Sequence, residues 1–413
     1  MIFRCYFCKK QIMKLVHIVF TLMITTVLFS CSSKDAEEES VVENLVVTSV
    51  SGFSGNEETQ SVSVISNLDW SVSSDSNWIT TTPSSGTNSG AIAISVETNP
   101  TYNDRSGTVT VSGGTMSRDV AITQAAAEET NGTLDPNKTP SENFDLSTWN
   151  LSIPEDQGNG TATTISVSQI NNNYENSSYF YTAADGGMVF KCPVDGYKTS
   201  ENTSYTRVEL REMLRGTNTS INTQGVNGNN WVFGTAPIAD INAAAGYDGE
   251  MNATLAVNHV TTTGSNSHVG RVIIGQIHAN DDEPIRIYYR KLQNNALGSI
   301  YFAHEPTDGN GAEQWYEMIG SRSNSASNPT DGIALNEVFS YRIKVVGDDL
   351  TVTIIREGKP DVVETVNMVN SGFNVGGQYM YFKAGVYQGN NSGDDDDYVQ
   401  ATFYALEKTH TTN

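Results

Sequence analysis

Cysteine is scarce in this chain of 413 residues, which contains four. Cys5 and Cys8 lie in an N-terminal segment that has the character of a removable signal, and Cys31 ends that segment. Only Cys192 remains, so no disulfide can form within the processed chain. The fold must therefore be stabilised by sheet packing and a sizeable hydrophobic core.

Basic residues are also few. Lys and Arg together number 24 against 47 Asp and Glu, which gives a formal net charge of -23. Because binding to nucleic acid needs a broad basic surface, this composition argues against a nucleic-acid partner. An anionic ligand would have to be bound by a local group of basic side chains.

Long amphipathic helical patterns are hard to find, while Thr, Ser, Asn and Gly are abundant. Short segments of alternating apolar and polar residues recur along the chain, and turn-forming residues separate them. This pattern predicts an all-β protein, and the length allows two or three domains.

The N-terminus carries one apolar run, "LVHIVFTLMITTVLF", which follows Lys14 and is too short for a comfortable membrane span. The string "LFSC" at its end resembles the cleavage box of bacterial lipoproteins, so residues 1–31 are interpreted as a signal peptide. Cys31 then becomes the lipidated first residue of the mature protein. Met1 and Met13 both remain open as the true start.

Residues 32–41 include "SSKDAEEES", which is similar to the acidic tethers that send some lipoproteins to the outer cell surface. An ordinary acidic linker would have the same composition. These segments predict an outer membrane lipoprotein exposed at the cell surface. The periplasmic face of that membrane and secretion are the alternatives.

Residues 42–125 form short alternating strands broken by Gly, Asn and Ser, which is typical of a small β-sandwich. The marker residues of this segment are Trp70, Trp78, Pro83, Gly86, Asn99, Arg105, Gly107 and Gln124. In that arrangement it resembles the BACON family of immunoglobulin-like modules, which are often attached to secreted carbohydrate-active enzymes. The two tryptophans are interpreted as core rather than as a sugar platform. Because the segment is acidic and has only two basic residues, we interpret the module as a spacer.

Residues 126–143 lack periodicity and are rich in small and breaker residues, so they are interpreted as a linker. Residues 144–408 form a larger domain with strong β signals. In "YRIKVVGDDLTVTIIREG", apolar residues alternate on both sides of a Gly-Asp-Asp turn. A single β domain of this length fits a double-sheet jelly roll with one open, curved face.

The stretch "SYTRVELREM" places Arg207, Glu209 and Arg211 at every second position, with Val208 and Leu210 between them. In an extended strand the charged side chains share one face and the apolar ones share the other. An ordinary solvated strand would alternate in the same way, so this stretch alone does not indicate a site.

Two further stretches, "RVIIGQIHAN" and "YMYFKAGVYQ", alternate similarly. Their polar faces carry Gln276, His278, Tyr381, Lys383 and Tyr387. Gly275 leaves room beside the first pair, and Gly385 removes a side chain from the second row. Three separate strands with this choice of residues predict a polar groove rather than an ordinary solvated surface.

The segments "RVELR", "QIH" and "YFKAGVY" resemble, in the same order, the three signature segments of the family 7 polysaccharide lyases, the alginate lyases. The opening "NFDLSTWNLSIP" is also similar to the start of their catalytic domain, so the resemblance extends from Phe144 to the C-terminus. Each motif alone is weak, but three in order on predicted strands are specific. The chain departs from the family pattern directly after Tyr387, where "QGNN" puts sugar contacts of Gln388 in doubt.

The resemblance implies a lyase that removes the C5 proton of a uronate unit and expels the oxygen on C4, giving unsaturated oligosaccharides. Because the ionised carboxylate makes that proton weakly acidic, Arg207 and Gln276 are expected to bind the carboxylate as negative charge develops. His278 is implied as the base and Tyr387 as the proton donor to the leaving oxygen. For the epimer whose C5 proton lies on the leaving-group side, Tyr387 can make both transfers.

Four more residues are expected to bind substrate or to orient the residues that do: Glu209, Arg211, Lys383 and Tyr381. Arg211 and Lys383 are assigned to neighbouring subsites, and Glu209 is expected to orient the two arginines of its strand by charge pairing. Tyr381 stacks on a sugar ring or packs at the groove floor. In the family, Ile at the position of Ile277 is associated with guluronate-containing chains, so we expect those chains to be preferred.

The expected partner is alginate, the expected state is a monomer, and no cofactor or metal is expected. His259, His268 and His304 are scattered without metal-ligand spacing. The acidic run Asp394 to Asp397 leaves a calcium loop open, but it lacks an EF-hand pattern and is interpreted as a solvated loop.

Two other functions remain open. A non-catalytic surface polysaccharide-binding lipoprotein would keep the arginines and aromatic rings but would have no use for His278 beside Gln276. A jelly-roll glycoside hydrolase needs two carboxylates across the scissile bond, and the nearest pair, Glu209 and Glu212, falls on opposite faces of one strand. Internal and chain-end cleavage also stay open, because the loops around the groove decide between them.

Overall fold

The computed structural model describes residues 42–99, 104–125 and 134–412. The predicted signal peptide with Cys31, the predicted acidic tether of residues 32–41 and the first part of the predicted linker lie outside the described residues. Among the helices that are described, none is long and apolar enough to cross a membrane.

The N-terminal module consists of two four-stranded sheets. The strands of one sheet, in spatial order, are β1 (Leu45–Val47), β2 (Glu58–Ser66), β6 (Gly90–Val96) and β4 (Ile79–Thr82). The strands of the other are β5 (Ser85–Thr87), β3 (Asp69–Ser74), β7 (Arg105–Gly113) and β8 (Met116–Gln124). Trp70 and Trp78 are 4% and 9% exposed within the core of the module, which confirms that they are core residues.

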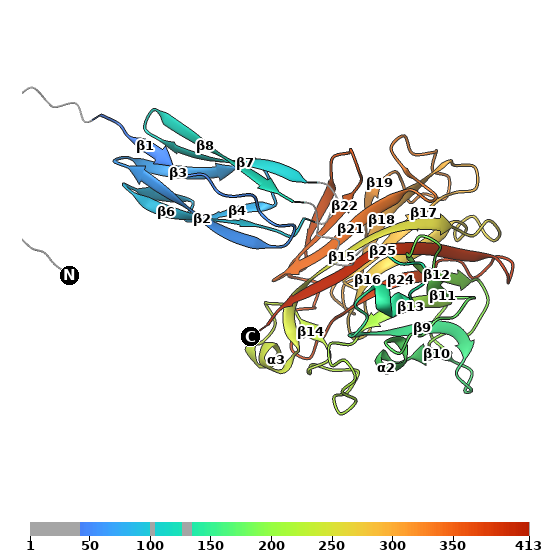
Figure 1. Ribbon diagram of the computed structural model, residues 1–413. Helices are drawn as coiled ribbons and strands as arrows, with labels where there is room; N and C mark the ends of the chain where they lie inside the picture. Colours follow the sequence, from blue (N-terminus) through green and yellow to red (C-terminus); the bar gives the residue numbers. More distant parts are fainter. Residues whose placement is uncertain (1–41, 100–103, 126–133, 413) are drawn as a thin grey trace, which may run out of the picture. The chain divides into compact units, whose positions relative to one another are not determined.

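The larger domain is built from two sheets, whose strands pair antiparallel except for β14 (Figure 1). The nine-stranded sheet has the order β10 (Ala162–Ile165), β9 (Trp149–Asp156), β13 (Arg207–Glu212), β24 (Tyr381–Gln388), β16 (Arg271–His278), β17 (Ile285–Arg290), β18 (Leu297–His304) and β19 (Gln314–Ile319), and β20 (Ile333–Ala334) pairs with β18. The eight-stranded sheet has the order β11 (Phe180–Thr182), β12 (Met188–Pro193), β25 (Tyr398–Thr411), β15 (Gly246–His259), β21 (Val338–Val346), β22 (Asp349–Ile355) and β23 (Val362–Asn367), and β14 (Trp231–Val232) pairs in parallel with β15. The described helices are short: α1 (Pro140–Asn143), α2 (Val167–Ile170) and α3 (Ile238–Ala243).

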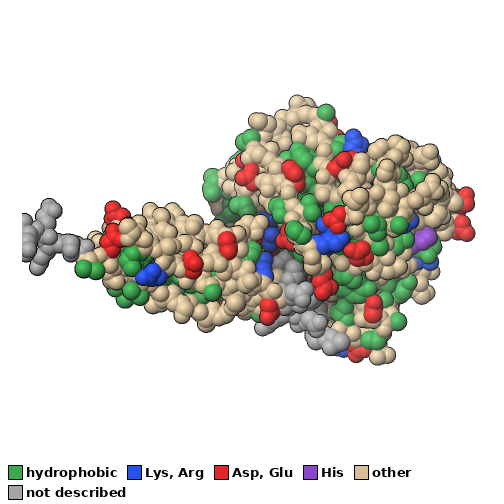
Figure 2. Space-filling model, turned by 90° about the horizontal axis from the view of Figure 1, so that it is seen from above, with side chains coloured by type: hydrophobic (Ala, Val, Ile, Leu, Met, Phe, Trp, Pro, Cys, Tyr) green, Lys and Arg blue, Asp and Glu red, His purple; other side chains and the backbone are tan. Residues whose placement is uncertain are grey.

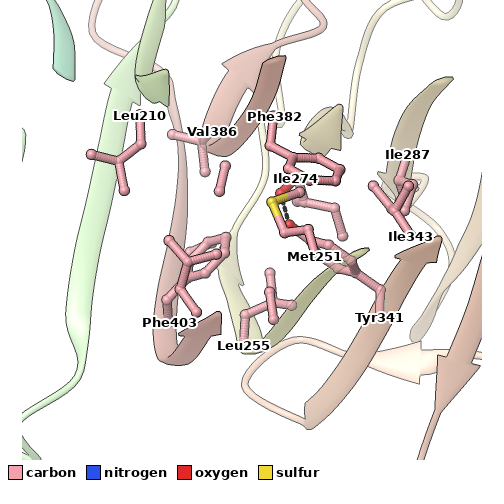
Figure 3. Packing of buried hydrophobic residues seen from close by; sticks show 14 of the residues in the cluster. Leu210, Met251, Leu255, Ile274, Ile287, Tyr341, Ile343, Phe382, Val386 and Phe403 are labelled. Carbon is pink, nitrogen blue, oxygen red and sulfur yellow. Dashed lines mark hydrogen bonds between the residues drawn. The ribbon is translucent and has the colours of Figure 1, made fainter. Parts of the chain in front are cut away.

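A large hydrophobic core fills the space between the two sheets. Figure 3 shows Leu210, Ile274 and Phe382 of the nine-stranded sheet packed toward Met251 and Phe403 of the eight-stranded sheet. The apolar members of the three predicted strands therefore lie in this core. Their polar members are left on the other face of the nine-stranded sheet. The prediction of an all-β protein with a double-sheet jelly roll is confirmed.

Gly275 has a different role from the one the sequence suggested. A Cβ atom there would lie 2.5 Å from the hydroxyl of Tyr341, a buried residue of β21 that donates a hydrogen bond to the Ile274 carbonyl. The pairing of β16 with both of its neighbours also shifts between Ile273 and Gly275. Gly275 thus makes room in the core for the phenol of Tyr341, not beside Gln276 and His278 on the polar face.

The surface reflects the composition. Figure 2 shows a face of the molecule on which Asp and Glu side chains are scattered, while Lys and Arg form only a few small groups. Because the net charge is -23, an anionic ligand can be bound only where basic side chains are grouped locally.

Candidate active site

The three motif strands are neighbours at the centre of the nine-stranded sheet, where β24 lies between β13 and β16. Arg207 lies opposite Tyr387, and Arg211 lies opposite Lys383. On the other side of β24, Lys383 pairs with Gln276. Strand pairing therefore brings together residues that are separated by up to 180 positions in the chain.

Glu209 is the centre of this group. Its carboxylate is buried, lies 3.1 Å from Nη1 of Arg207 and forms a close ion pair with Nζ of Lys383. The side-chain amide of Gln276 donates a hydrogen bond to the other carboxylate oxygen. Glu209 was expected to pair with both Arg207 and Arg211. It does pair with Arg207, but its second cation is Lys383 from the neighbouring strand and not Arg211.

The charge cluster shifts the pKa values of its members. Burial raises the pKa of Glu209, but Lys383 and Arg207 outweigh burial and lower it overall. Burial and the nearby Arg207 lower the pKa of Lys383 to about 8, even though Glu209 acts in the opposite direction. Glu209 is therefore ionised at neutral pH. The pKa of Lys383 is only slightly above neutral pH.

Tyr387 lies against Arg207. The guanidinium carbon of Arg207 is 3.8 Å from the centre of the Tyr387 ring, and the ring of Tyr205 meets the same tyrosine edge-on at 6.1 Å. Burial raises the pKa of Tyr387, and Glu209 acts in the same direction. Its hydroxyl is therefore protonated at neutral pH, which is the state that a proton donor needs.

His278 lies at the end of β16, where its ring stacks on Tyr381 at 5.1 Å with an angle of 9° between the planes. The Nδ1 atom is 2.7 Å from the carbonyl oxygen of Ala279. Because that oxygen can only accept, Nδ1 carries the proton and Nε2 has the free lone pair. Burial, with help from Lys383 and Arg207, lowers the pKa of His278 to about 3, so the ring is neutral and able to accept a proton.

Arg211 lies on the same strand face but makes different contacts. Its guanidinium donates to the carbonyls of Glu212 and Thr223 and to the side chain of Asn230, and it lies 3.8 Å over the Tyr381 ring. Arg211 thus anchors the segment that follows β13, while Arg207 and Lys383 share the central carboxylate. Its expected role in a neighbouring subsite stays a prediction.

Gln388 lies away from the polar face. It is fully buried, and its side chain approaches the carbonyl of Cys192 on the other sheet at 3.4 Å. The departure from the family pattern after Tyr387 therefore falls at a residue that packs inside the domain.

The second carboxylate considered for a hydrolase lies on the core side of β13. Glu212 is fully buried, with Nε2 of His410 at 2.8 Å and Nζ of Lys408 at 3.0 Å from one oxygen. It is therefore separated from Glu209 by the strand itself, so the two carboxylates cannot face each other across a sugar bond.

His304 and Asp397, the last residue of the acidic run, make local contacts. His304 is buried between the Pro284 carbonyl and the Ser371 hydroxyl, and Asp397 accepts hydrogen bonds from Thr262 and Thr263. Among the described residues, no group of three or more His, Cys, Asp or Glu is placed to hold a metal ion.

Sequence reasoning missed Glu283, which lies beside His278, and Arg286, which pairs with Glu283. Oε1 of Glu283 is 3.4 Å from Nε2 of His278, and Oε2 is 2.9 Å from Nη1 of Arg286. Arg286 lies on β17 directly opposite Gln276. The alternation in "IRIYYR" carries a signal for Arg286, but only strand pairing shows that it faces the site.

The comparison with protein families decides the assignment. The family model described as alginate lyase matches residues 144–410. The chain belongs to the alginate lyase family. The BACON model, whose description is that of an N-terminal binding domain, matches residues 68–125 of the module that precedes the lyase domain.

Solved and curated relatives agree with this assignment. An alginate lyase from Klebsiella pneumoniae is 58% identical over 279 residues, which are 66% of this chain and 91% of that protein. The crystal structure of the alginate lyase from Klebsiella pneumoniae matches with a TM-score of 0.65 and 57% identity over 66% of this chain and 98% of that one. The exolytic PL7 alginate lyase from Zobellia galactanivorans matches with a TM-score of 0.50 and 22% identity over 66% of this chain and 98% of that one, which supports the fold alone.

Proposed function

We propose that this alginate lyase cleaves alginate by β-elimination and prefers guluronate-containing chains, with Arg207, Gln276, His278 and Tyr387 as its catalytic residues. The observation that carries the proposal is the arrangement of a neutral histidine and a protonated tyrosine around one group of cations. These are the protonation states that a base and an acid need at the start of the reaction.

The reaction begins when the uronate carboxylate binds to Arg207 and to the amide of Gln276. Nε2 of His278 takes the C5 proton, the electron pair forms the double bond between C4 and C5, and the C4–O bond breaks. Tyr387 gives its proton to the departing oxygen. The cationic group stabilises the negative charge that develops on the carboxylate, so it acts in the step that limits an uncatalysed elimination.

The expected preference for guluronate rests on the same states. In guluronate the C5 proton lies opposite the leaving oxygen, so base and acid must be different groups, as His278 and Tyr387 are. In mannuronate both transfers lie on one side, where Tyr387 would first have to lose its proton. The raised pKa of Tyr387 disfavours that state. Ile277 is buried and cannot contact the sugar. It can act only by shifting the strand that carries Gln276 and His278.

The test is the increase in ultraviolet absorbance from unsaturated product on polyguluronate and polymannuronate. We expect faster cleavage of polyguluronate, and we expect His278→Ala to reduce guluronate cleavage more than mannuronate cleavage. Tyr387→Phe should abolish both, because both routes need its proton. A strong wild-type preference for polymannuronate, or equal losses on both substrates in His278→Ala, would refute this division of roles.

We further propose that the protein is a monomeric lipoprotein of the outer membrane, attached through Cys31 and exposed at the cell surface. The "LFSC" string and the acidic residues after it support this location. The N-terminal module would then act as a spacer between the membrane and the lyase domain. A second candidate, sugar binding by the module, has less support because both of its tryptophans are buried.

A further inference from the structure

The groups around His278 make its imidazole a weak base. From β24 it faces the ring of Tyr381 and the ammonium group of Lys383, and from β13 it faces Arg207 and Glu209. From the loop before β17 it faces Glu283, which in turn pairs with Arg286 on β17. Burial and the two nearest cations oppose a positive charge on the ring, so a proton taken from C5 needs a compensating negative group.

Glu283 is the only carboxylate in ion-pair contact with Nε2 among the described residues. Its Oε1 atom is 3.4 Å from Nε2 of His278, and its side chain is 15% exposed. Since Nδ1 is committed to the Ala279 carbonyl, Nε2 is the atom that must accept the proton. The carboxylate thus lies beside the nitrogen on which positive charge would appear.

Glu283 is held in that position by an ion-pair network. Its Oε2 atom is 2.9 Å from Nη1 of Arg286, and the other terminal nitrogen of Arg286 pairs with Glu305 at 2.8 Å and with Glu313. Burial lowers the pKa of Arg286, but the surrounding anionic groups outweigh it and raise the pKa overall, so this cation is permanent. A carboxylate fixed in this way loses little conformational freedom when it binds the charged ring.

We propose that Glu283 is a positioning residue for His278, whose carboxylate holds the ring in place once it is charged and stabilises the imidazolium that forms when the C5 proton is transferred. The C5 proton is transferred to Nε2 and stays there, and the Glu283 carboxylate, 3.4 Å away, offsets the positive charge of the ring without taking up the proton. This inference rests on the proposed role of His278 as base. It adds a residue that contacts the base and does not contact the sugar.

The experiment compares Glu283→Gln with Glu313→Gln on polyguluronate. Both variants remove one carboxylate from Arg286, but only the first removes the contact with His278. We expect Glu283→Gln to lower kcat about tenfold with little change in KM, because the carboxylate that stabilises the charged ring is absent when the charge forms. Glu313→Gln should keep kcat within about twofold, since it does not touch the ring.

Two further measurements separate positioning from a merely structural role. Glu283→Asp keeps the charge but withdraws it from Nε2, so its kcat should lie between those of wild type and Glu283→Gln. In the His278→Ala background, Glu283→Gln should cause no additional loss, because its effect passes through the ring. Should Glu283→Gln not fold, as judged by thermal unfolding, the aspartate variant decides alone: unchanged kcat would overturn the proposal.

The outcomes distinguish this inference from the proposed function. If His278→Ala keeps full activity on polyguluronate, the base is another group and both proposals fail. If His278→Ala is inactive while Glu283→Gln behaves like Glu313→Gln, only the role of Glu283 fails. An equal further loss from Glu283→Gln in the presence and absence of His278 would also overturn it.

Discussion

The carboxylate of Glu209 balances the charge of the site before substrate arrives. Two cations, Arg207 and Lys383, share this one anion, so the group has one excess positive charge. A uronate carboxylate brings the matching negative charge. The buried glutamate thus offsets part of the repulsion between the arginine and the lysine, and it leaves one positive charge for the ligand.

Arg207 is expected to matter most in the transition state. Arg207→Ala should lower kcat at least about a hundredfold, or about 3 kcal/mol, because it removes a fixed cation where charge develops. Circular dichroism should show that the domain still folds. The assay is ultraviolet absorbance on alginate across a range of substrate concentrations.

Arg211→Ala is the matched comparison, because it removes the same kind of side chain on the same face of β13, four residues along the strand. We expect a rise in KM with a smaller change in kcat, together with a lower melting temperature from loss of the bonds to Thr223 and Asn230. Similar falls in kcat for the two variants would show that their roles are not separate.

Strand β13 links the site to the rest of the fold through its two faces. One face carries Arg207 and Glu209, and the other carries the buried Glu212, which pairs with Lys408 and His410 on β25 of the opposite sheet. Glu212 also accepts a hydrogen bond from the backbone N–H of Phe382. The same carboxylate therefore fixes β13, β24 and β25 relative to one another.

This link predicts a pH dependence of stability. Burial acts against ionisation of Glu212, but His410 and Lys408 lower its pKa from 4.5 to about 2. A carboxyl whose pKa is lowered in the folded state stabilises the protein above its unfolded pKa and loses that effect as pH falls. Glu212 should therefore contribute about 3 kcal/mol at neutral pH, and this contribution should disappear between about pH 4.5 and pH 2.

Glu212→Gln tests the link by urea unfolding at several pH values. The variant should be less stable than wild type at pH 7, and the difference should shrink as the pH approaches 2. Glu364→Gln, at an exposed position of β23, is the control and should follow wild type. A constant difference at every pH would mean that ionisation of Glu212 is not responsible.

Alternation along β13, β16 and β24 predicted the two faces of each strand, because side chains in an extended strand alternate whatever the neighbouring strands are. It could not predict which strands pair. Glu209 was expected to pair with both Arg207 and Arg211 of its own strand; the pair with Arg207 forms, but the second cation is Lys383 of β24 and not Arg211. Contacts across strands depend on register, which is set by the whole sheet.

The whole molecule joins a β-sandwich module to a lyase domain, with Cys31 before both. Anchoring through Cys31 gives a third test. Cys31→Ala should move the protein from the membrane fraction to the soluble fraction, while the activity of the lyase domain on dissolved alginate stays unchanged. Firm attachment implies more than one acyl chain, because a single chain holds a protein only weakly.

Mass spectrometry of the native N-terminus supplies the control for the anchoring test. A lipid-modified peptide beginning at Cys31 is the expected result. An unmodified N-terminus produced by cleavage at another position would contradict the assignment of residues 1–31 as a lipoprotein signal.

Local patterns in the sequence were enough to predict the fold class, which the structure confirms, and short motifs were enough to propose the order of the domains and the four residues assigned to the reaction. Each of these depends on the period of a strand or on short motifs that keep their meaning without neighbours. Packing decided the rest. The space that Gly275 leaves for Tyr341, the anchoring contacts of Arg211 and the placement of Glu283 beside His278 all join segments that are distant or on different strands. Such contacts follow from how two sheets close around one core, and no single stretch of sequence contains that information.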